Sequence, residues 1–303
     1  MKKYLIFSLL AVLMVCSTAT AAEKKAKKAL PQKEMALQLY SIRTVFSDKN
    51  YAEKHAEIFN SLKKYGYSSV EAASYNDGKF YGVTPEQFKS DLAAAGLTAL
   101  SSHTTRNLNA DELAGHNFTE ALKWWDKAIV AHKAAGMTYI VAPSGTTPKN
   151  ATEAQTLCDY LNAVGAKCKE AGLKFGYHSH SFEYKKIDGT DTPWIQYMME
   201  HIDPANMFWQ MDVYWCVMAQ ESPVEWFKKY PGRNTMLHIK DKYEIGQSGM
   251  VNFQAIFKNA ALCGLKDYVV ELERTDGTID IMEGVKRSAT YLRKANYVKA
   301  SYK

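Results

Sequence analysis

After residue 34 the chain repeats one pattern of apolar and polar positions. An amphipathic helix pattern ends in glycine, and an apolar strand pattern follows at once. Glycine adopts the left-handed conformation that closes a helix and turns the chain back. Each such glycine therefore predicts a step from helix to strand, and the six junctions are Gly66, Gly96, Gly136, Gly172, Gly232 and Gly264.

Reading outward from these junctions predicts eight strands, over residues 35–43, 68–74, 97–104, 137–144, 173–180, 207–215, 235–241 and 267–273. Helix patterns lie between them, the longest over 118–135 and 152–171. Another begins at Thr84, which we expect to cap the helix while Gln87 closes a capping box.

Strands that alternate with helices favour a parallel sheet. Eight such units in about 250 residues match a (β/α)₈ TIM barrel, and we predict that α/β fold as a single domain over residues 34–303. The competing doubly wound sheet needs a glycine-rich turn after its first strand, and no such turn follows Arg43.

Residues 1–33 depart from the repeating pattern. Lys2 and Lys3 precede an apolar run over 5–15, and small residues at 19–22 follow it. This layout predicts a secretory signal peptide over 1–22, whose apolar run is too short to span a bilayer, and a mobile basic linker over 23–33. We therefore expect export, with the periplasm as the destination; lipidation at Cys16 is the alternative N-terminal processing.

Charge and cysteine content narrow the function further. The net charge is +6, but residues 1–33 hold seven of the 38 basic and one of the 32 acidic residues, so the remainder carries 31 of each. A neutral body does not indicate a nucleic-acid partner, and no membrane span is predicted. The remaining cysteines lack metal-type spacing, and we expect buried free thiols at Cys158, Cys168, Cys216 and Cys263.

Polar side chains end four consecutive predicted strands. In a TIM barrel the active site lies at these carboxyl ends, and alternate residues of a strand share a face. Asp212, between Met211 and Val213, either caps the next helix or belongs to a site, since a buried carboxylate without a partner costs several kcal/mol. Two imidazoles and two carboxylates from adjacent strands suit one divalent ion, Mn²⁺, Co²⁺, Zn²⁺ or Mg²⁺. The strand-end residues are His178, His180, Asp212, His238, Lys240, Glu271 and Glu273.

Five motifs stand in order along the chain: Leu37-Gln-Leu-Tyr-Ser-Ile-Arg43, Tyr177-His-Ser-His-Ser-Phe-Glu183, Met211-Asp-Val-Tyr-Trp215, Leu237-His-Ile-Lys-Asp241 and Val270-Glu-Leu-Glu273. Together they make the chain resemble the sugar phosphate isomerase/epimerase family, which has a xylose-isomerase-like barrel. The resemblance implies a divalent metal held by His178, Asp212, His238 and Glu271, with a small carbohydrate as substrate. It also implies a proton moved next to a carbonyl through a metal-stabilised enediolate.

One departure keeps the reaction open. Family epimerases often have glutamate where this chain has His178, so the symmetric pair of carboxylates across the substrate is broken. Glu271 can act from one side, with His180 and Lys240 as further catalytic candidates, and Glu273 could replace Glu271 as the ligand. The alternatives are an isomerase or epimerase, a carbon–oxygen lyase acting on a 3-keto-glycoside or inosose, and a non-catalytic sugar-binding barrel.

Other strand ends are expected to form a sugar site. The motifs contain no obvious basic clamp for a phosphate, so the expected substrate is an unphosphorylated sugar or keto-sugar; the oligomeric state stays open. The substrate-binding candidates are Gln38, Tyr40, Glu71, His103, Glu183, Trp215 and Glu273.

Overall fold

The computed structural model describes residues 29–303. The predicted signal peptide, Cys16 and most of the predicted linker therefore lie outside the described residues. Eight strands form the barrel: β1 (Ala36–Gln38), β2 (Ser69–Ala72), β5 (Thr98–Ser102), β6 (Tyr139–Ala142), β7 (Lys174–Ser179), β8 (Met207–Asp212), β9 (Met236–Lys240) and β10 (Asp267–Glu271).

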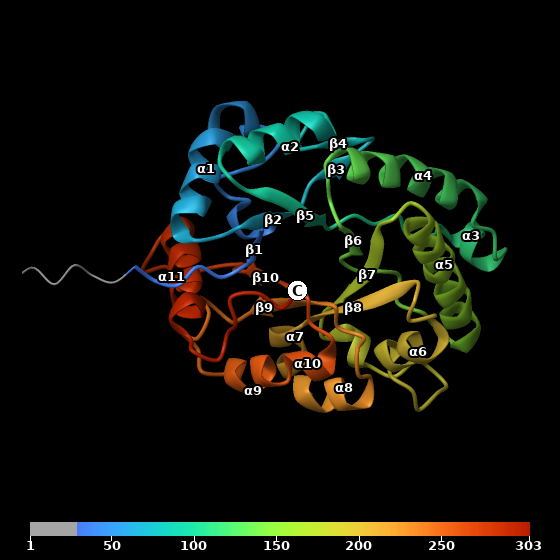
Figure 1. The fold of residues 1–303 in the computed structure, drawn as a ribbon. Helices are drawn as coiled ribbons and strands as arrows, with labels where there is room; N and C mark the ends of the chain where they lie inside the picture. Colours follow the sequence, from blue (N-terminus) through green and yellow to red (C-terminus); the bar gives the residue numbers. More distant parts are fainter. Residues whose placement is uncertain (1–28) are drawn as a thin grey trace, which may run out of the picture.

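These strands pair in parallel in the order β5-β2-β1-β10-β9-β8-β7-β6. Backbone hydrogen bonds from Thr138 N to Leu100 O (3.0 Å) and from Thr104 N to Val141 O (2.9 Å) join β5 to β6. The sheet thus closes on itself, as the view along the barrel in Figure 1 shows. The predicted TIM barrel is confirmed.

Helices form a ring outside the strands (Figure 1). A short hairpin of β3 (Tyr75–Asn76) and β4 (Lys79–Phe80), which the sequence pattern did not predict, follows β2. Two 3₁₀ helices, η1 (Leu39–Ile42) and η2 (Phe182–Tyr184), follow β1 and β7. The helices are α1 (Tyr51–Tyr65), α2 (Pro85–Ala94), α3 (Ala110–Ala114), α4 (Thr119–Ala134), α5 (Ala151–Glu170), α6 (Trp194–His201), α7 (Val213–Met218), α8 (Pro223–Lys229), α9 (Phe253–Lys258), α10 (Ala260–Cys263) and α11 (Ile281–Lys294).

The helix-to-strand junctions follow the prediction. All six junction glycines have positive φ, from 73° at Gly96 to 108° at Gly66. Thr84 caps α2 by accepting a hydrogen bond from Gln87 N, but the Gln87 side chain donates to Asp91. The expected capping box is therefore only half formed.

Two strands are shorter than predicted because side-chain caps end them. The first was expected to reach Arg43, but the Gln38 amide oxygen accepts from Tyr40 N at 3.0 Å and starts η1. The strand over 207–215 ends at Asp212, whose Oδ1 accepts from the backbone nitrogens of Tyr214 (2.9 Å) and Trp215 (3.0 Å) and starts α7. Both residues stand at the carboxyl end of the barrel.

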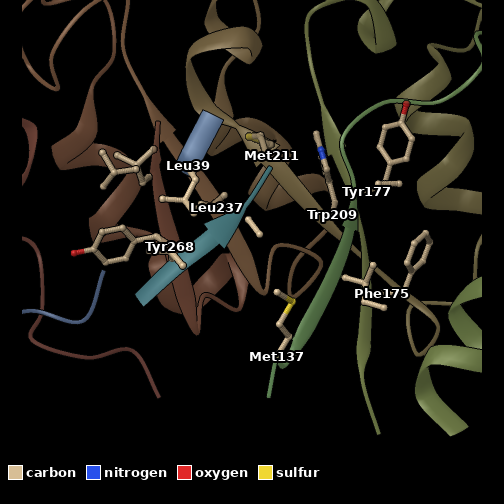
Figure 2. Close-up of a cluster of buried hydrophobic side chains, with 14 of the residues drawn as sticks. Leu39, Met137, Phe175, Tyr177, Trp209, Met211, Leu237 and Tyr268 are labelled. Carbon is tan, nitrogen blue, oxygen red and sulfur yellow. The ribbon is translucent and has the colours of Figure 1, made fainter. Parts of the chain in front are cut away.

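The core has two layers. Outward-facing strand residues pack under the helices, and Figure 2 shows Phe175 and Tyr177 of β7 and Trp209 and Met211 of β8 in this layer. A smaller apolar cluster fills the amino-terminal half of the barrel interior, leaving the carboxyl-terminal half to polar residues. Its members are Ala36, Leu100, Tyr139, Val141, Phe208, Met236 and Val269.

The described part of the predicted linker is bound to α11. Arg293 donates to the carbonyls of Leu30 (2.7 Å) and Pro31 (3.0 Å). Lys33 is buried and donates to Leu292 O at 2.9 Å and Ala295 O at 2.5 Å. The last carbonyls of a helix lack intrahelical donors, and Lys33 supplies one, so it caps α11. This part of the linker was expected to be mobile, but the structure shows it bound to α11.

The four described cysteines are free and buried, as predicted. Across residues 29–303, no helix combines the length and apolar character that a bilayer crossing requires.

Candidate metal centre

Asp212, His238 and Glu271 meet at the carboxyl ends of three adjacent strands, β8, β9 and β10. The Nδ1 atom of His238 lies 3.7 Å from Asp212 Oδ2 and 3.5 Å from Glu271 Oε2. One ligand atom from each residue lies within 4.8 Å of the other two. This geometry brings one imidazole and two carboxylates to a single point inside the barrel.

Two buried polar atoms in this cluster lack a hydrogen-bond partner, His238 Nδ1 and Asp212 Oδ2. Leaving such atoms unpaired is costly, and a cation between them would satisfy both. One nitrogen and two oxygens form a donor set that suits divalent ions such as Zn²⁺ or Mn²⁺. The residues therefore fit a divalent ion. The sequence left open whether Asp212 caps the next helix or belongs to a site. In the structure it does both, because one oxygen caps α7 and the other faces the cluster.

The electrostatics of the cluster favour positive charge at His238. Burial alone lowers the pKa of His238, but Asp212, Glu271 and Glu71 outweigh it and raise that pKa well above its usual range. Burial alone raises the pKa of Glu271, but the hydrogen bond and charge of His238, aided by Lys240, hold it at about 2. Glu271 is therefore ionised at neutral pH, as a metal ligand must be.

Glu71 stands behind His238 as a fully buried carboxylate. Burial raises the pKa of Glu71, but the neighbouring His103 and His238 outweigh it and lower that pKa well below its usual range. Five side chains surround its oxygens: Gln38 Nε2 (2.8 Å), His238 Nε2 (2.8 Å), His103 Nε2 (3.0 Å), Ser101 Oγ (2.7 Å) and Gln210 Nε2 (2.9 Å).

These contacts change the expected roles of Glu71 and Gln38. Both were expected to bind substrate hydroxyls, yet both are completely buried. The oxygens of Glu71 already accept from five side chains, and the amide of Gln38 is used by Glu71 and by the cap of η1. They support the cluster from beneath and do not face a substrate.

His178 lies beside the cluster but in a second group. Together with His103 and His238 it forms a set of imidazoles whose nitrogens also lie within 4.8 Å of one another. Its ring centroid is 4.6 Å from that of His238 and 4.8 Å from that of His103. Burial lowers the pKa of His178 well below its usual range. The structure thus gathers three of the four expected ligands at one point and places His178 on the other side of His238, with the imidazoles. His103, which was expected to bind substrate, is hydrogen-bonded to Gln210.

His180 borders the cluster with a free nitrogen. It shares a face with His178, as strand alternation predicted, with ring centroids 4.7 Å apart. Its buried Nδ1 has no hydrogen-bond partner, and Trp215 Nε1 nearby has none either. Burial lowers the pKa of His180, so the ring is neutral at pH 7 and can accept a proton.

Lys240 and Glu273 form an ion pair at the end of β9 and β10, with 3.3 Å between Nζ and Oε2. The lysine is buried and its ammonium lies over the rings of Tyr214 (5.3 Å) and Trp215 (5.8 Å). Glu273 is 31% exposed, whereas Glu271 is 7% exposed and contacts His238. The geometry therefore favours Glu271 as the ligand and leaves Glu273 with Lys240.

Two further substrate candidates differ in position. Glu183 is buried and accepts from Tyr177 Oη (3.0 Å) and His180 N (2.8 Å). Burial raises the pKa of Glu183 to about 7. Tyr40 is 45% exposed, with the Arg43 guanidinium 4.1 Å above its ring. Glu183 thus supports the backbone of His180, and Tyr40 lies on the exposed rim.

Sequence reasoning missed two members of the site, Gln210 and Ser101. Gln210 lies two positions before Asp212 on the same strand, so strand alternation could have placed its amide on the inner face. Ser101 gives no such signal, because a serine in a buried strand is common and its partner Glu71 lies 30 positions away.

Comparison with known proteins agrees with the fold. A sugar phosphate isomerase/epimerase from Parabacteroides distasonis is 34% identical, with a TM-score of 0.80 over 90% of this chain and 97% of that one. The IOLI protein with a bound zinc atom is 16% identical, with a TM-score of 0.64 over 88% of this chain and 99% of that one, a likeness of fold. An inosose dehydratase of Clostridium perfringens is 33% identical over 92 residues, so the match spans 30% of each chain.

The family model of the xylose isomerase-like TIM barrel matches residues 59–295, most of the described chain. That match takes in β2 and the three strands that carry Asp212, His238 and Glu271. The chain belongs to the xylose isomerase-like TIM barrel family.

Proposed function

We propose that this protein is a divalent-metal-dependent enzyme that isomerises or epimerises an unphosphorylated sugar or keto-sugar by moving a proton next to a carbonyl. The observation that carries the proposal is the cluster of Asp212, His238 and Glu271, with two buried atoms left unpaired. Support comes from the similar Parabacteroides sugar phosphate isomerase/epimerase and from the zinc atom in the IOLI protein of the same fold.

The residues around the cluster have separable roles. A divalent ion, when bound, supplies Lewis-acid polarisation of a substrate oxygen. His180 presents a neutral ring with a free Nδ1 as a proton acceptor. The Lys240 ammonium, fixed by Glu273 and two aromatic rings, is placed to hold a substrate oxygen as charge develops on it.

The substrate class follows from charge. Lys240, a cation at the strand ends beside the cluster, is already paired with Glu273. A dianionic phosphate would need further positive charge or backbone donors, so we propose an unphosphorylated substrate. The secretory pattern over residues 1–22 supports export, with the periplasm as the proposed compartment.

A carbon–oxygen lyase is the second candidate. His178 stands beside His238 where an epimerase would be expected to have a carboxylate, so acid and base differ on the two sides of the substrate. Removal of a proton followed by loss of an oxygen substituent suits such unequal groups. The short match to an inosose dehydratase supports the same alternative, with a 3-keto-glycoside or inosose as substrate.

Metal content is the first test. Purified protein should contain a divalent ion or gain thermal stability on addition of Mn²⁺, Co²⁺ or Zn²⁺. Asp212→Ala should lose that gain, whereas Asp126→Ala, at an exposed position on α4, should keep it. Absence of both bound ion and stabilisation in the wild type would refute the proposal.

Product analysis separates the two reactions. Incubation with ketoses and keto-glycosides in D₂O, followed by NMR, should show deuterium next to the carbonyl together with an isomeric product. Release of water or an aglycone would assign the lyase instead. Metal binding without any exchange across the panel would contradict both reactions.

A further inference from the structure

The buried pair of Glu71 and Gln210 lies against three imidazoles on the side away from Asp212 and Glu271. We propose that this pair sets which nitrogen of His238 and of His178 serves the ion: in each ring the nitrogen bonded to the pair keeps its hydrogen, and the other nitrogen is the one that can bind the ion. The inference rests on the proposed function and assigns Glu71 and Gln210 as positioning residues that do not themselves touch the ion.

The orientation of the Gln210 amide is fixed by Glu71. Its Nε2 donates to Glu71 Oε2 at 2.9 Å, and a carboxylate can only accept. The amide oxygen must therefore face the rings, where it lies 3.0 Å from His178 Nδ1 and 3.0 Å from His103 Nε2. An amide oxygen can only accept as well, so both ring nitrogens carry the hydrogen.

For His178 this leaves one free nitrogen. With its hydrogen on Nδ1, the neutral imidazole has its lone pair on Nε2. The ring is therefore held in the Nδ1–H tautomer. A histidine can bind a metal only through an unprotonated nitrogen.

For His238 the same network selects the opposite nitrogen. Its Nε2 lies 2.8 Å from Glu71 Oε1 and donates to it. Its Nδ1 is the atom that faces Asp212 and Glu271 and has no hydrogen-bond partner. A carboxylate behind a ligating histidine fixes the ring tautomer and raises its basicity, so Glu71 directs Nδ1 to the ion.

Two further donors fix the orientation of the Glu71 carboxylate. Gln38 and Ser101, both completely buried, donate to its two oxygens at 2.8 Å and 2.7 Å. The bond to His238 crosses the barrel and joins residues 167 positions apart. The carboxylate is thus held by β1 and β5 while it positions a ligand on β9.

Zinc affinity tests the role of Glu71 without an activity assay. Zn²⁺ affinity, measured by competition with a chelating dye, should fall about 10- to 100-fold in Glu71→Gln, the range for loss of such a partner. Glu170→Gln is the matched control, since it makes the same change at an exposed position at the end of α5. Glu170→Gln should keep the wild-type affinity; equal affinities of wild type and Glu71→Gln would overturn the inference and leave the proposed function standing.

Histidine NMR tests the tautomers themselves. In ¹⁵N-labelled, metal-free wild type at about pH 8, well above the ordinary histidine pKa, His178 should show the Nδ1–H pattern. Gln210→Met, which removes the accepting oxygen, should change that pattern. An Nε2–H pattern for His178 in the wild type overturns the inference, even if Glu71→Gln does not fold. Wild type that binds no Zn²⁺ would defeat the proposed function, while the His178 pattern in the same sample still decides the inference.

Discussion

Glu183 should make the protein lose stability as the pH rises toward neutrality. Glu183 is a residue of η2 with a buried carboxyl group, and burial raises the pKa of that group from 4.5 to about 7. Below pH 4.5 the group is protonated in both the folded and the unfolded state. Between the two pKa values the unfolded chain releases the proton while the folded protein keeps it, so the free energy of unfolding falls with pH. Above pH 7 the loss is complete.

The size of the effect follows from the shift. A difference of about 2.5 pKa units corresponds to about 3 kcal/mol. Glu183→Gln keeps the shape and, like the protonated carboxyl, has one oxygen that accepts from His180 N and one group that can donate to Tyr177 Oη, but it does not ionise. The variant should therefore match the wild type near pH 4.5 and exceed it in stability by up to about 3 kcal/mol at pH 8.

Urea denaturation at several pH values, with a chelator present so that metal binding does not contribute, measures this difference. Glu170→Gln, at an exposed position at the end of α5, serves as the control and should follow the wild-type pH dependence. A constant difference between Glu183→Gln and wild type from pH 4.5 to pH 8 would refute the reasoning.

Three other substitutions have expected outcomes. A Cβ at Gly176 would lie 2.4 Å from the ring of Phe208, so Gly176→Ala should lower the free energy of unfolding by about 1–3 kcal/mol. In the double variant, Phe208→Leu should restore part of that free energy. Purely additive losses from the two substitutions would contradict the packing argument. Lys240→Met should lower kcat about 10²- to 10³-fold, because it removes the positive charge that holds the substrate oxygen, and it should leave the Zn²⁺ affinity unchanged. Equal loss of kcat and Zn²⁺ affinity would assign Lys240 to the metal site. Lys33→Ala should lower the free energy of unfolding, measured by urea denaturation, by about 1–3 kcal/mol because two carbonyls at the end of α11 lose their donor. An unchanged free energy of unfolding would show that water replaces the lysine as donor.

The order and number of the barrel elements were predictable because their signals are local. A glycine that closes a helix and an apolar run that follows it can be read within a few residues, and the six junction glycines have the positive φ they require. The position of the candidate site was predictable for the same reason, since it lies where strands end. The four residues proposed as ligands all come from these ends.

Strand lengths were less predictable. Gln38 and Asp212 each end a strand by accepting hydrogen bonds from the backbone ahead. The apolar pattern continues past both positions, so hydrophobicity alone extends the strands too far. Whether a polar residue caps the next turn depends on a side-chain rotamer that the pattern does not contain.

The sequence by itself determined a TIM barrel with histidines and carboxylates at the ends of neighbouring strands, because periodicity and strand-end position are properties of short segments. Only the tertiary structure decided which atoms face one another. It turned Glu71 from a substrate candidate into the partner of His238, across 167 positions of sequence, and grouped His178 with His103. Closing the barrel brings Glu71 of β2 against His238 of β9 through its interior, and this contact decides which nitrogen of His238 faces Asp212 and Glu271.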